Sequence, residues 1–197
     1  MLPITLQVNA QWVSNACGHS GIKNILTGIV PISHRRCDKI TPRYMFNKNY
    51  VVEIPKQSDW IGNNIDLYDD IVCYTDGSKL ETTGSTEASV YDYTHDYKHT
   101  LPLGKYATVF QAELYAILTC ASLLRNSIDR SISICSDSQA AFKSIFAAKT
   151  TPHLVWETAM TLQHLSVHNC VRLLWVPRHS NIDGNENTRM NSQNKPH

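Results

Sequence analysis

The sequence contains no apolar run that approaches the roughly 18–20 consecutive residues of a membrane-spanning helix. Its 197 residues are 42% hydrophobic and 18% charged, a composition typical of soluble globular proteins. No basic segment precedes an apolar stretch between Met1 and Gln7, so the pattern of a secretory signal is missing. We therefore expect an intracellular protein of the cytoplasm or nucleus that is neither secreted nor membrane-bound.

An excess of charge of one sign is also missing. Lys and Arg together number 18 and Asp and Glu 17, so the formal net charge is +1. Such a balance provides no overall field that would attract a polyanion. Any binding of nucleic acid must therefore depend on local groups and local geometry.

Cysteines in disulfide-like spacing are absent as well. The six cysteines are dispersed, and Cys73, Cys120, Cys135 and Cys170 lie within apolar runs, where reduced thiols pack as small hydrophobic groups. Among the others, Cys17 and Cys37 flank His19 and His34, and thiolates and imidazoles are preferred zinc ligands.

A standard zinc-finger spacing is not found among these four residues, because fourteen residues separate Cys-x-His from His-x-x-Cys. Unliganded side chains are the favoured interpretation of this group. A zinc-binding adaptor remains an alternative, and it predicts stoichiometric zinc in the purified protein.

The length is sufficient for one domain of ordinary size and an additional segment. Residues 1–65 contain several prolines among basic and aromatic residues, which predicts an N-terminal, loop-rich extension. Polar turn-forming residues then precede the first strongly apolar strand. We therefore place the folded domain at residues 66–190 and a polar tail at residues 191–197.

The order of hydrophobic periodicities within this domain predicts a mixed α/β fold with a central sheet covered by helices. Three strand patterns come first, followed by alternating helices and strands. Strands are expected at 71–74, 88–93, 97–103, 131–135 and 171–176, and helices at 109–124, 139–148 and 153–165.

Three acidic residues occupy comparable places in this layout. Asp76 ends the first strand, Glu113 lies in the first turn of the first helix, and Asp137 ends the following strand. If the two strands are neighbours, both aspartates emerge at one edge of the sheet, and the helix can place Glu113 between them. Clustered carboxylates repel one another unless a divalent cation neutralises them, and oxygen ligands favour magnesium or manganese.

Each acid also has a simpler interpretation when it is considered alone. Asp76 can be a turn residue, Glu113 can stabilise the helix dipole, and Asp137 can cap the helix that follows.

Four motifs occur in a fixed order along the domain: YTDGS, FQAELYA, SDSQAA and WVPRHSNIDGNE, the last at residues 175–186. Together they resemble the successive signatures of type 1 ribonuclease H domains, of the kind found at the C-terminal end of non-LTR retrotransposon (reverse transcriptase) polyproteins. Residues 40–60 resemble the connection between reverse transcriptase and ribonuclease H in such elements. The resemblance implies a ribonuclease H-like fold, in which a mixed five-stranded sheet with its first three strands antiparallel is flanked by helices.

The resemblance also implies an activity, namely metal-dependent endonucleolytic hydrolysis of the RNA strand of RNA–DNA hybrids. By matching position, Asp76, Glu113 and Asp137 would hold two Mg²⁺ (or Mn²⁺) ions. His179 would shuttle a proton during product release, a role that suits a pKa near 6.5. We expect a monomer that can be part of a longer polyprotein.

Substrate contacts are implied at two places. Gly77 and Ser78 would let the backbone approach the RNA, and Ser138 and Gln139 at a helix N-terminus would meet phosphate or sugar. Selectivity would come from 2′-hydroxyl and groove-shape contacts. Turn and helix-cap chemistry is the alternative interpretation of all four residues.

One departure from the family pattern bears on activity. The family normally has a fourth acid three residues after its Gly-Asn-Glu motif, and this position is Arg189 here. A guanidinium cannot bind a cation and adds positive charge where the metal should lie, so weakened activity is expected unless Asp183 compensates. The alternative function is a catalytically inactive, retroelement-derived nucleic-acid-binding module, which cleavage of a hybrid would distinguish.

Overall fold

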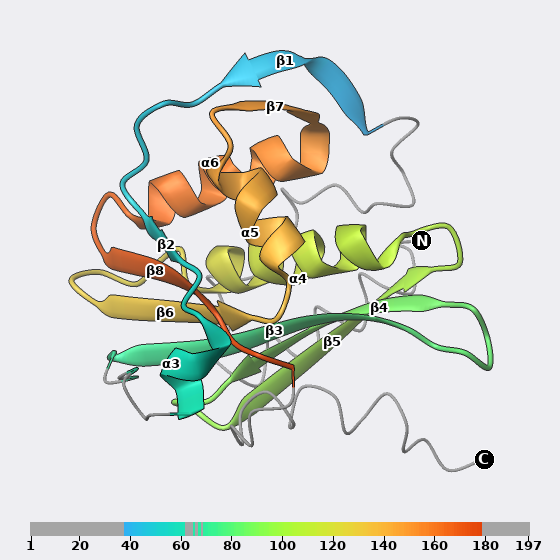
Figure 1. The fold of residues 1–197 in the computed structure, drawn as a ribbon, viewed down its shortest axis with the longest axis horizontal. Helices are drawn as coiled ribbons and strands as arrows, with labels where there is room; N and C mark the ends of the chain where they lie inside the picture. The colour runs from blue at the N-terminus through green and yellow to red at the C-terminus, as the bar shows by residue number, and fades with distance from the viewer. Residues whose placement is uncertain (1–37, 62–64, 66, 68, 179–197) are drawn as a thin grey trace.

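A six-stranded mixed sheet, with the strand order β2-β8-β6-β3-β4-β5, is the framework of the computed structural model (Figure 1). The structure describes residues 38–61, 65, 67 and 69–178. Strands β3, β4 and β5 are antiparallel, whereas β3, β6, β8 and β2 run parallel. The strands are β2 (Val51–Glu53), β3 (Ile71–Lys79), β4 (Thr86–Asp92), β5 (Tyr97–Gly104), β6 (Ser131–Ser136) and β8 (Cys170–Trp175).

Helices cover the two faces of the sheet unequally. Helices α4 (Val109–Leu123), α5 (Gln139–Phe146) and α6 (His153–Leu165) lie together above the sheet in Figure 1. Alternate residues of a strand point to opposite faces, so Cys73 joins the large core under these helices, whereas Tyr74 joins a smaller cluster on the other face. Short helix α3 (Gln57–Ile61) contributes a tryptophan to that smaller cluster. Among the described helices, none is both long and apolar enough to cross a membrane.

The predicted mixed α/β fold is confirmed, but the sheet has six strands where five were expected. The additional strand is β2, which pairs parallel with β8 through Val51↔Arg172 and Glu53↔Leu174. Three residues are too few for a periodic pattern, so the sequence contains no signal for this strand. Arg172 also contacts the carboxylate of Glu53, with 3.6 Å between Nη1 and Oε2, which attaches the new strand to the sheet.

A second, two-stranded sheet was not expected either. It is formed by β1 (Lys39–Tyr44) and β7 (Lys149–Pro152), which run antiparallel at the end of the molecule where α5 leads into α6 (Figure 1). Asp38 attaches this sheet to α6, because its Oδ1 accepts a hydrogen bond from the Leu154 backbone N–H at 2.9 Å. Part of the expected loop-rich extension is therefore strand that packs on the rest of the fold.

Candidate active site

Asp76 lies in β3 at the point where pairing with β6 has ended but pairing with β4 continues. The parallel pairing of β3 with β6 ends at Thr75↔Ser136, whereas the antiparallel pairing with β4 continues to Lys79↔Thr86. The predicted strand end at Asp76 is therefore wrong, because pairing with β4 holds Asp-Gly-Ser as strand despite its turn-like composition. The Asp76 side chain is placed just beyond the end of β6 and is only 4% exposed.

Gly77 permits an unusually close approach of α4 to β3. A Cβ atom at this position would lie 2.4 Å from the Glu113 backbone nitrogen and 2.8 Å from the Ala112 carbonyl carbon. Any other residue would therefore push the helix away from the strand. A structural role for Gly77 is thus evident, and it brings Glu113 next to Asp76.

The beginning of α4 sets the position of Glu113 along the helix axis. Thr108 and Gln111 form a reciprocal capping box, with the Gln111 N–H donating to Thr108 Oγ1 at 3.2 Å and the Thr108 N–H donating to Gln111 Oε1 at 2.9 Å. Glu113 is consequently the fifth helical residue and lies in the second turn. The expected first-turn position, and with it the dipole interpretation, is wrong because the first turn contains no acid.

Asp137 connects the end of β6 with the beginning of α5. The helix is capped by Ser138, whose Oγ accepts from the Ala141 N–H at 3.3 Å, so the capping role falls to the serine. The indole N–H of Trp175 donates to the Asp137 carbonyl at 3.0 Å. These contacts fix the backbone while the Asp137 side chain, 5% exposed, lies toward the other acids.

The three predicted carboxylates converge. Asp76, Glu113 and Asp137 each offer a carboxylate oxygen, and these oxygens lie within 4.8 Å of one another. The cluster contains no thiolate or imidazole, and a purely carboxylate donor set favours hard cations such as Mg²⁺ or Mn²⁺. These residues therefore fit a divalent metal ion of the kind expected from the sequence.

Glu113 is the most strongly perturbed of the three acids. Burial raises the pKa of Glu113 to about 9, with further contributions from the charges of Asp76 and Asp137. Hydrogen bonds from the Gly77 backbone and from the Ser136 hydroxyl, 3.4 Å from Oε2, oppose this shift. Glu113 thus retains its proton at neutral pH in the metal-free protein, and a neighbouring cation would favour its ionised form.

Arg178 is a member of the site that sequence reasoning missed. Its Nε donates to Asp137 Oδ2 at 3.1 Å, while the side chain is 60% exposed. The hydrogen bond and the charge of Asp137 raise the pKa of Arg178. Its place directly before His179 in the fourth motif is the signal by which it could have been found.

Ser136 was missed for a different reason. It stands in the third motif beside Asp137, but its role depends on a contact with a helix 23 residues away in sequence. Its Oγ also accepts from the Ser138 N–H at 3.2 Å. Ser136 therefore links the turn after β6 to the Glu113 carboxylate.

The predicted substrate-binding residues border the cluster on two sides. Gly77 and Ser78 follow Asp76 on β3, and Ser138 and Gln139 follow Asp137 at the beginning of α5. Ser78 and Gln139 are half-buried, and Gln139 Oε1 accepts from Lys143 Nζ at 3.2 Å. The remaining predicted residues lie outside the described part of the chain: His179, Asp183, Arg189, and the zinc candidates Cys17, His19, His34 and Cys37.

The arrangement of sheet, helices and carboxylates agrees with the comparison with protein families. No match was found among the curated proteins. The family model for RNase H matches residues 68–193, which is more than half of the chain, and the protein therefore belongs to the RNase H family of nucleases.

Proposed function

We propose that this protein is a metal-dependent endonuclease that hydrolyses the RNA strand of RNA–DNA hybrids. The observation that carries the proposal is the convergence of Asp76, Glu113 and Asp137 within 4.8 Å in a chain of the RNase H family. The order of its four motifs and the residues within them support a retrotransposon-type domain that is part of a reverse transcriptase polyprotein. Two Mg²⁺ or Mn²⁺ ions are the proposed cofactors.

Bound divalent ions would activate the attacking water and stabilise the leaving oxygen. The three carboxylates would hold them, and the chain supplies the orientation of these ligands. The Gly77 backbone and the Ser136 hydroxyl direct the Glu113 carboxylate, while Trp175 fixes the backbone of Asp137. Hydrogen bonds that hold metal-ligating residues in this way tune the position of the ligands and their affinity for the metal.

Proton transfer and substrate attraction are assigned to two residues that follow β8 in the sequence. His179 is proposed to shuttle a proton during product release, since an ordinary histidine titrates near pH 6.5. Arg178 lies beside Asp137 and is largely exposed, so its guanidinium can attract an approaching phosphate. Selection for RNA would come from 2′-hydroxyl contacts of the backbone near Gly77 and Ser78.

The direct test is incubation of a labelled RNA–DNA hybrid with Mg²⁺ and, separately, with Mn²⁺. We expect cleavage of the RNA strand by the wild type and none by Asp76→Asn. Asp129→Asn is the matched control, because Asp129 is exposed and its left-handed backbone, with φ of 55°, is equally open to Asn. Wild-type cleavage no faster than that of Asp76→Asn would contradict the proposal.

A catalytically inactive nucleic-acid-binding module is the second candidate, and Arg189 in place of the family's fourth acid favours it. This alternative predicts hybrid binding that weakens with salt but no cleavage. Comparing Arg189→Asp with the wild type measures the effect of that exchange. A large gain in rate in the variant would assign weakened activity to Arg189.

A further inference from the structure

The pair of strands β1 and β7, with residues 45–48 that follow β1, is here called the arm. Its strands pair through Arg43↔Thr150 and Tyr44↔Lys149. In Figure 1 the arm lies beyond the end of α5 that is farther from the sheet. The proposed chemistry at the carboxylate cluster makes no use of it.

The arm exposes aromatic rings that a folded protein would ordinarily bury. The exposed fractions are 55% for Tyr44 and 76% for Phe46, and 56% for Phe146 at the adjoining end of α5. Tyr44 and Phe46 are stacked, with ring centroids 6.1 Å apart and planes inclined by 18°. Lys149 Nζ lies 5.9 Å from the Tyr44 ring centroid, which places a cation beside the stack.

The surface formed by Tyr44, Phe46 and Phe146, here called the aromatic surface, is held in place by hydrogen bonds to the rest of the fold. Lys48 Nζ donates to the carbonyls of Met45 at 2.8 Å and Phe146 at 3.0 Å, and lies 5.4 Å from the Phe146 ring centroid. The Met45 N–H donates to the Ala148 carbonyl at 2.9 Å. The rings are therefore presented on a fixed scaffold and are pre-organised for a ligand.

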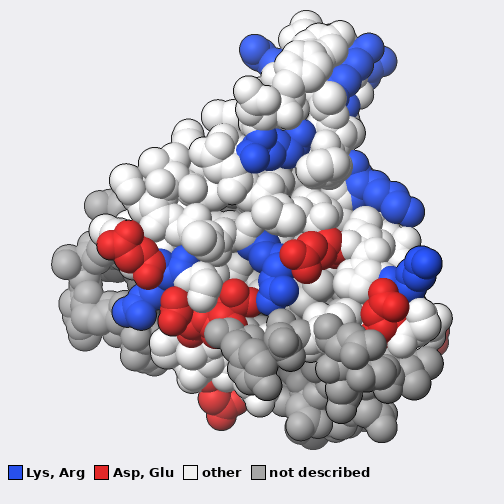
Figure 2. Space-filling view, turned by 60° about the vertical axis from the view of Figure 1, so that its left-hand side comes forward, with Lys and Arg blue, Asp and Glu red and all other residues white. Residues whose placement is uncertain are grey.

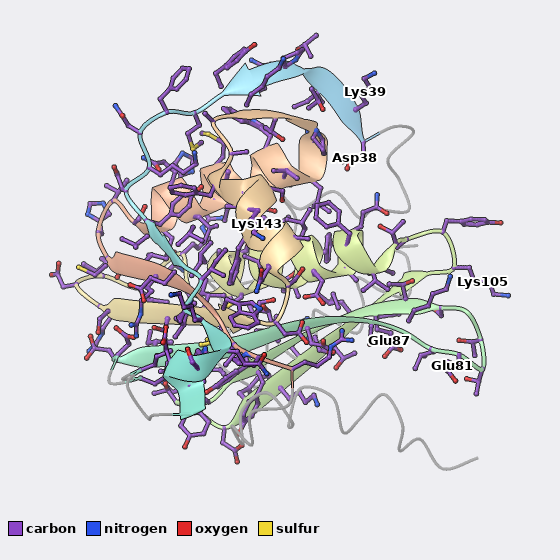
Figure 3. All side chains as sticks on the ribbon, viewed as in Figure 1. Asp38, Lys39, Glu81, Glu87, Lys105 and Lys143 are labelled. Carbon is purple, nitrogen blue, oxygen red and sulfur yellow. The ribbon has the colours of Figure 1, made fainter. Side chains whose placement is uncertain are left out.

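The charge of this region is predominantly positive. Residues 38–48 and 143–152 contain five basic residues and a single acid, Asp38, whose carboxylate accepts from the Leu154 N–H. Figure 2 shows Lys and Arg, without Asp or Glu, over the upper end of the molecule, the height at which β1 and β7 lie in Figure 1. Figure 3 shows Lys143 on α5, between the arm and the sheet, and Lys39 on β1. The arm is thus complementary to a polyanion.

We propose that the arm binds single-stranded nucleic acid, with bases stacked on Tyr44, Phe46 and Phe146 and phosphates attracted by Arg43 and Lys149. Exposed aromatic rings combined with cations are the features by which proteins bind unpaired strands. A base-paired duplex does not offer its base faces to such rings, so the aromatic surface favours an unpaired strand over a duplex.

The position of the arm relative to the carboxylates adds to the proposed function and rests on it. Helix α5 begins two residues after Asp137 and ends at Phe146, and its eight residues span about 12 Å. That length corresponds to roughly four nucleotide steps of 3.4 Å. The substrate is therefore a hybrid with an unpaired extension that begins within several nucleotides of the cleaved bond.

The test is fluorescence anisotropy with a labelled 12-nucleotide single strand and, in parallel, a blunt-ended hybrid, both in EDTA so that no cleavage occurs. We expect the Tyr44→Ala, Phe46→Ala double variant to lose at least about 10-fold in affinity for the single strand. Tyr44→Trp should retain the affinity, because it keeps a stacking surface. Tyr106→Ala is the matched control, since Tyr106 is fully exposed but distant in sequence from the arm.

The outcomes separate this proposal from the proposed enzymatic function. Single-strand binding that survives Asp76→Asn, together with loss in the arm variants, supports the arm whether or not the wild type cleaves hybrids. Absence of single-strand binding by the wild type, or equal binding by the arm variants, overturns it and leaves cleavage of a blunt hybrid unaffected. Circular dichroism checks folding, and the single variants Tyr44→Ala and Phe46→Ala serve if the double variant does not fold.

Discussion

Replacement of Glu113 by Gln should stabilise the metal-free protein and remove part of its pH dependence. Burial, together with Asp76 and Asp137, raises the pKa of Glu113 from 4.5 to about 9. The glutamine is neutral and of similar shape, and its side-chain oxygen can still accept from the Ser136 hydroxyl. The variant therefore removes the free-energy cost of taking up a proton at Glu113 on folding, and it leaves the packing of α4 against β3 in place.

The sign and size of the effect follow from proton binding. Between pH 4.5 and pH 9 the folded protein keeps the Glu113 proton that the unfolded chain releases, so this group lowers the free energy of unfolding as pH rises. Each pH unit corresponds to about 1.4 kcal/mol, so the contribution changes by about 3 kcal/mol from pH 5 to pH 7. The difference in stability between Glu113→Gln and the wild type should grow by that amount.

Urea denaturation followed by far-UV circular dichroism, in EDTA at pH values from 5 to 8, measures this difference. Glu81→Gln is the control, because Glu81 is exposed and surface substitutions alter stability by at most about 0.5 kcal/mol. Saturating Mg²⁺ or Mn²⁺ should stabilise the wild type more than the variant, since binding to the folded state adds stability. A stability difference that stays constant, or declines, as the pH rises would refute the reasoning.

Three further predictions concern residues around the site and in the core. Gly77→Ala should destabilise by about 3 kcal/mol in denaturant unfolding, because the new Cβ meets α4 backbone. Gly84→Ala, which has open space but a φ of +65°, should cost about 1 kcal/mol. Arg178→Gln should tighten Mn²⁺ binding in a titration followed by electron paramagnetic resonance, since it removes the cation beside Asp137; weaker binding would count against the geometry. Burial lowers the pKa of His99 to about 4, so the unfolded chain binds the proton first and stability is lost as pH falls from 6.5 to 4, by up to about 3 kcal/mol. His99→Gln should abolish this acid-side loss in urea titrations, and an unchanged slope would exclude His99 as its source.

Long periodic segments were the part of the fold that the sequence predicted best. Helix α6 has the predicted bounds His153–Leu165, and α4 ends one residue earlier than expected. Both have apolar spacings of three and four over many residues, which local composition does not disturb. Strand β3 is five residues longer than predicted because its continuation depends on β4, a partner that a local pattern does not reveal.

The convergence of the carboxylates was also predictable, for a topological reason. Asp76 lies just beyond the point where the parallel pairing of β3 with β6 ends, and Asp137 directly follows β6. Helix α4 lies between these two strands in the sequence. The contacts of Arg178 and Ser136 were not predictable, because each joins elements that only the tertiary structure brings together. The same holds for β1 and β2, whose short pairings are with strands more than 100 residues later.

The parallel pairing of β2 with β8 also affects the order in which the chain folds during synthesis. During synthesis, Val51–Glu53 leaves the ribosome long before Cys170–Trp175 exists, and chains grow at about 5–20 residues per second. Strand β8 is therefore synthesised roughly 6–24 s after β2. Docking of residues 38–61 is accordingly a late step in folding, one that closes the sheet only after the carboxylate-bearing strands β3 and β6 have been made.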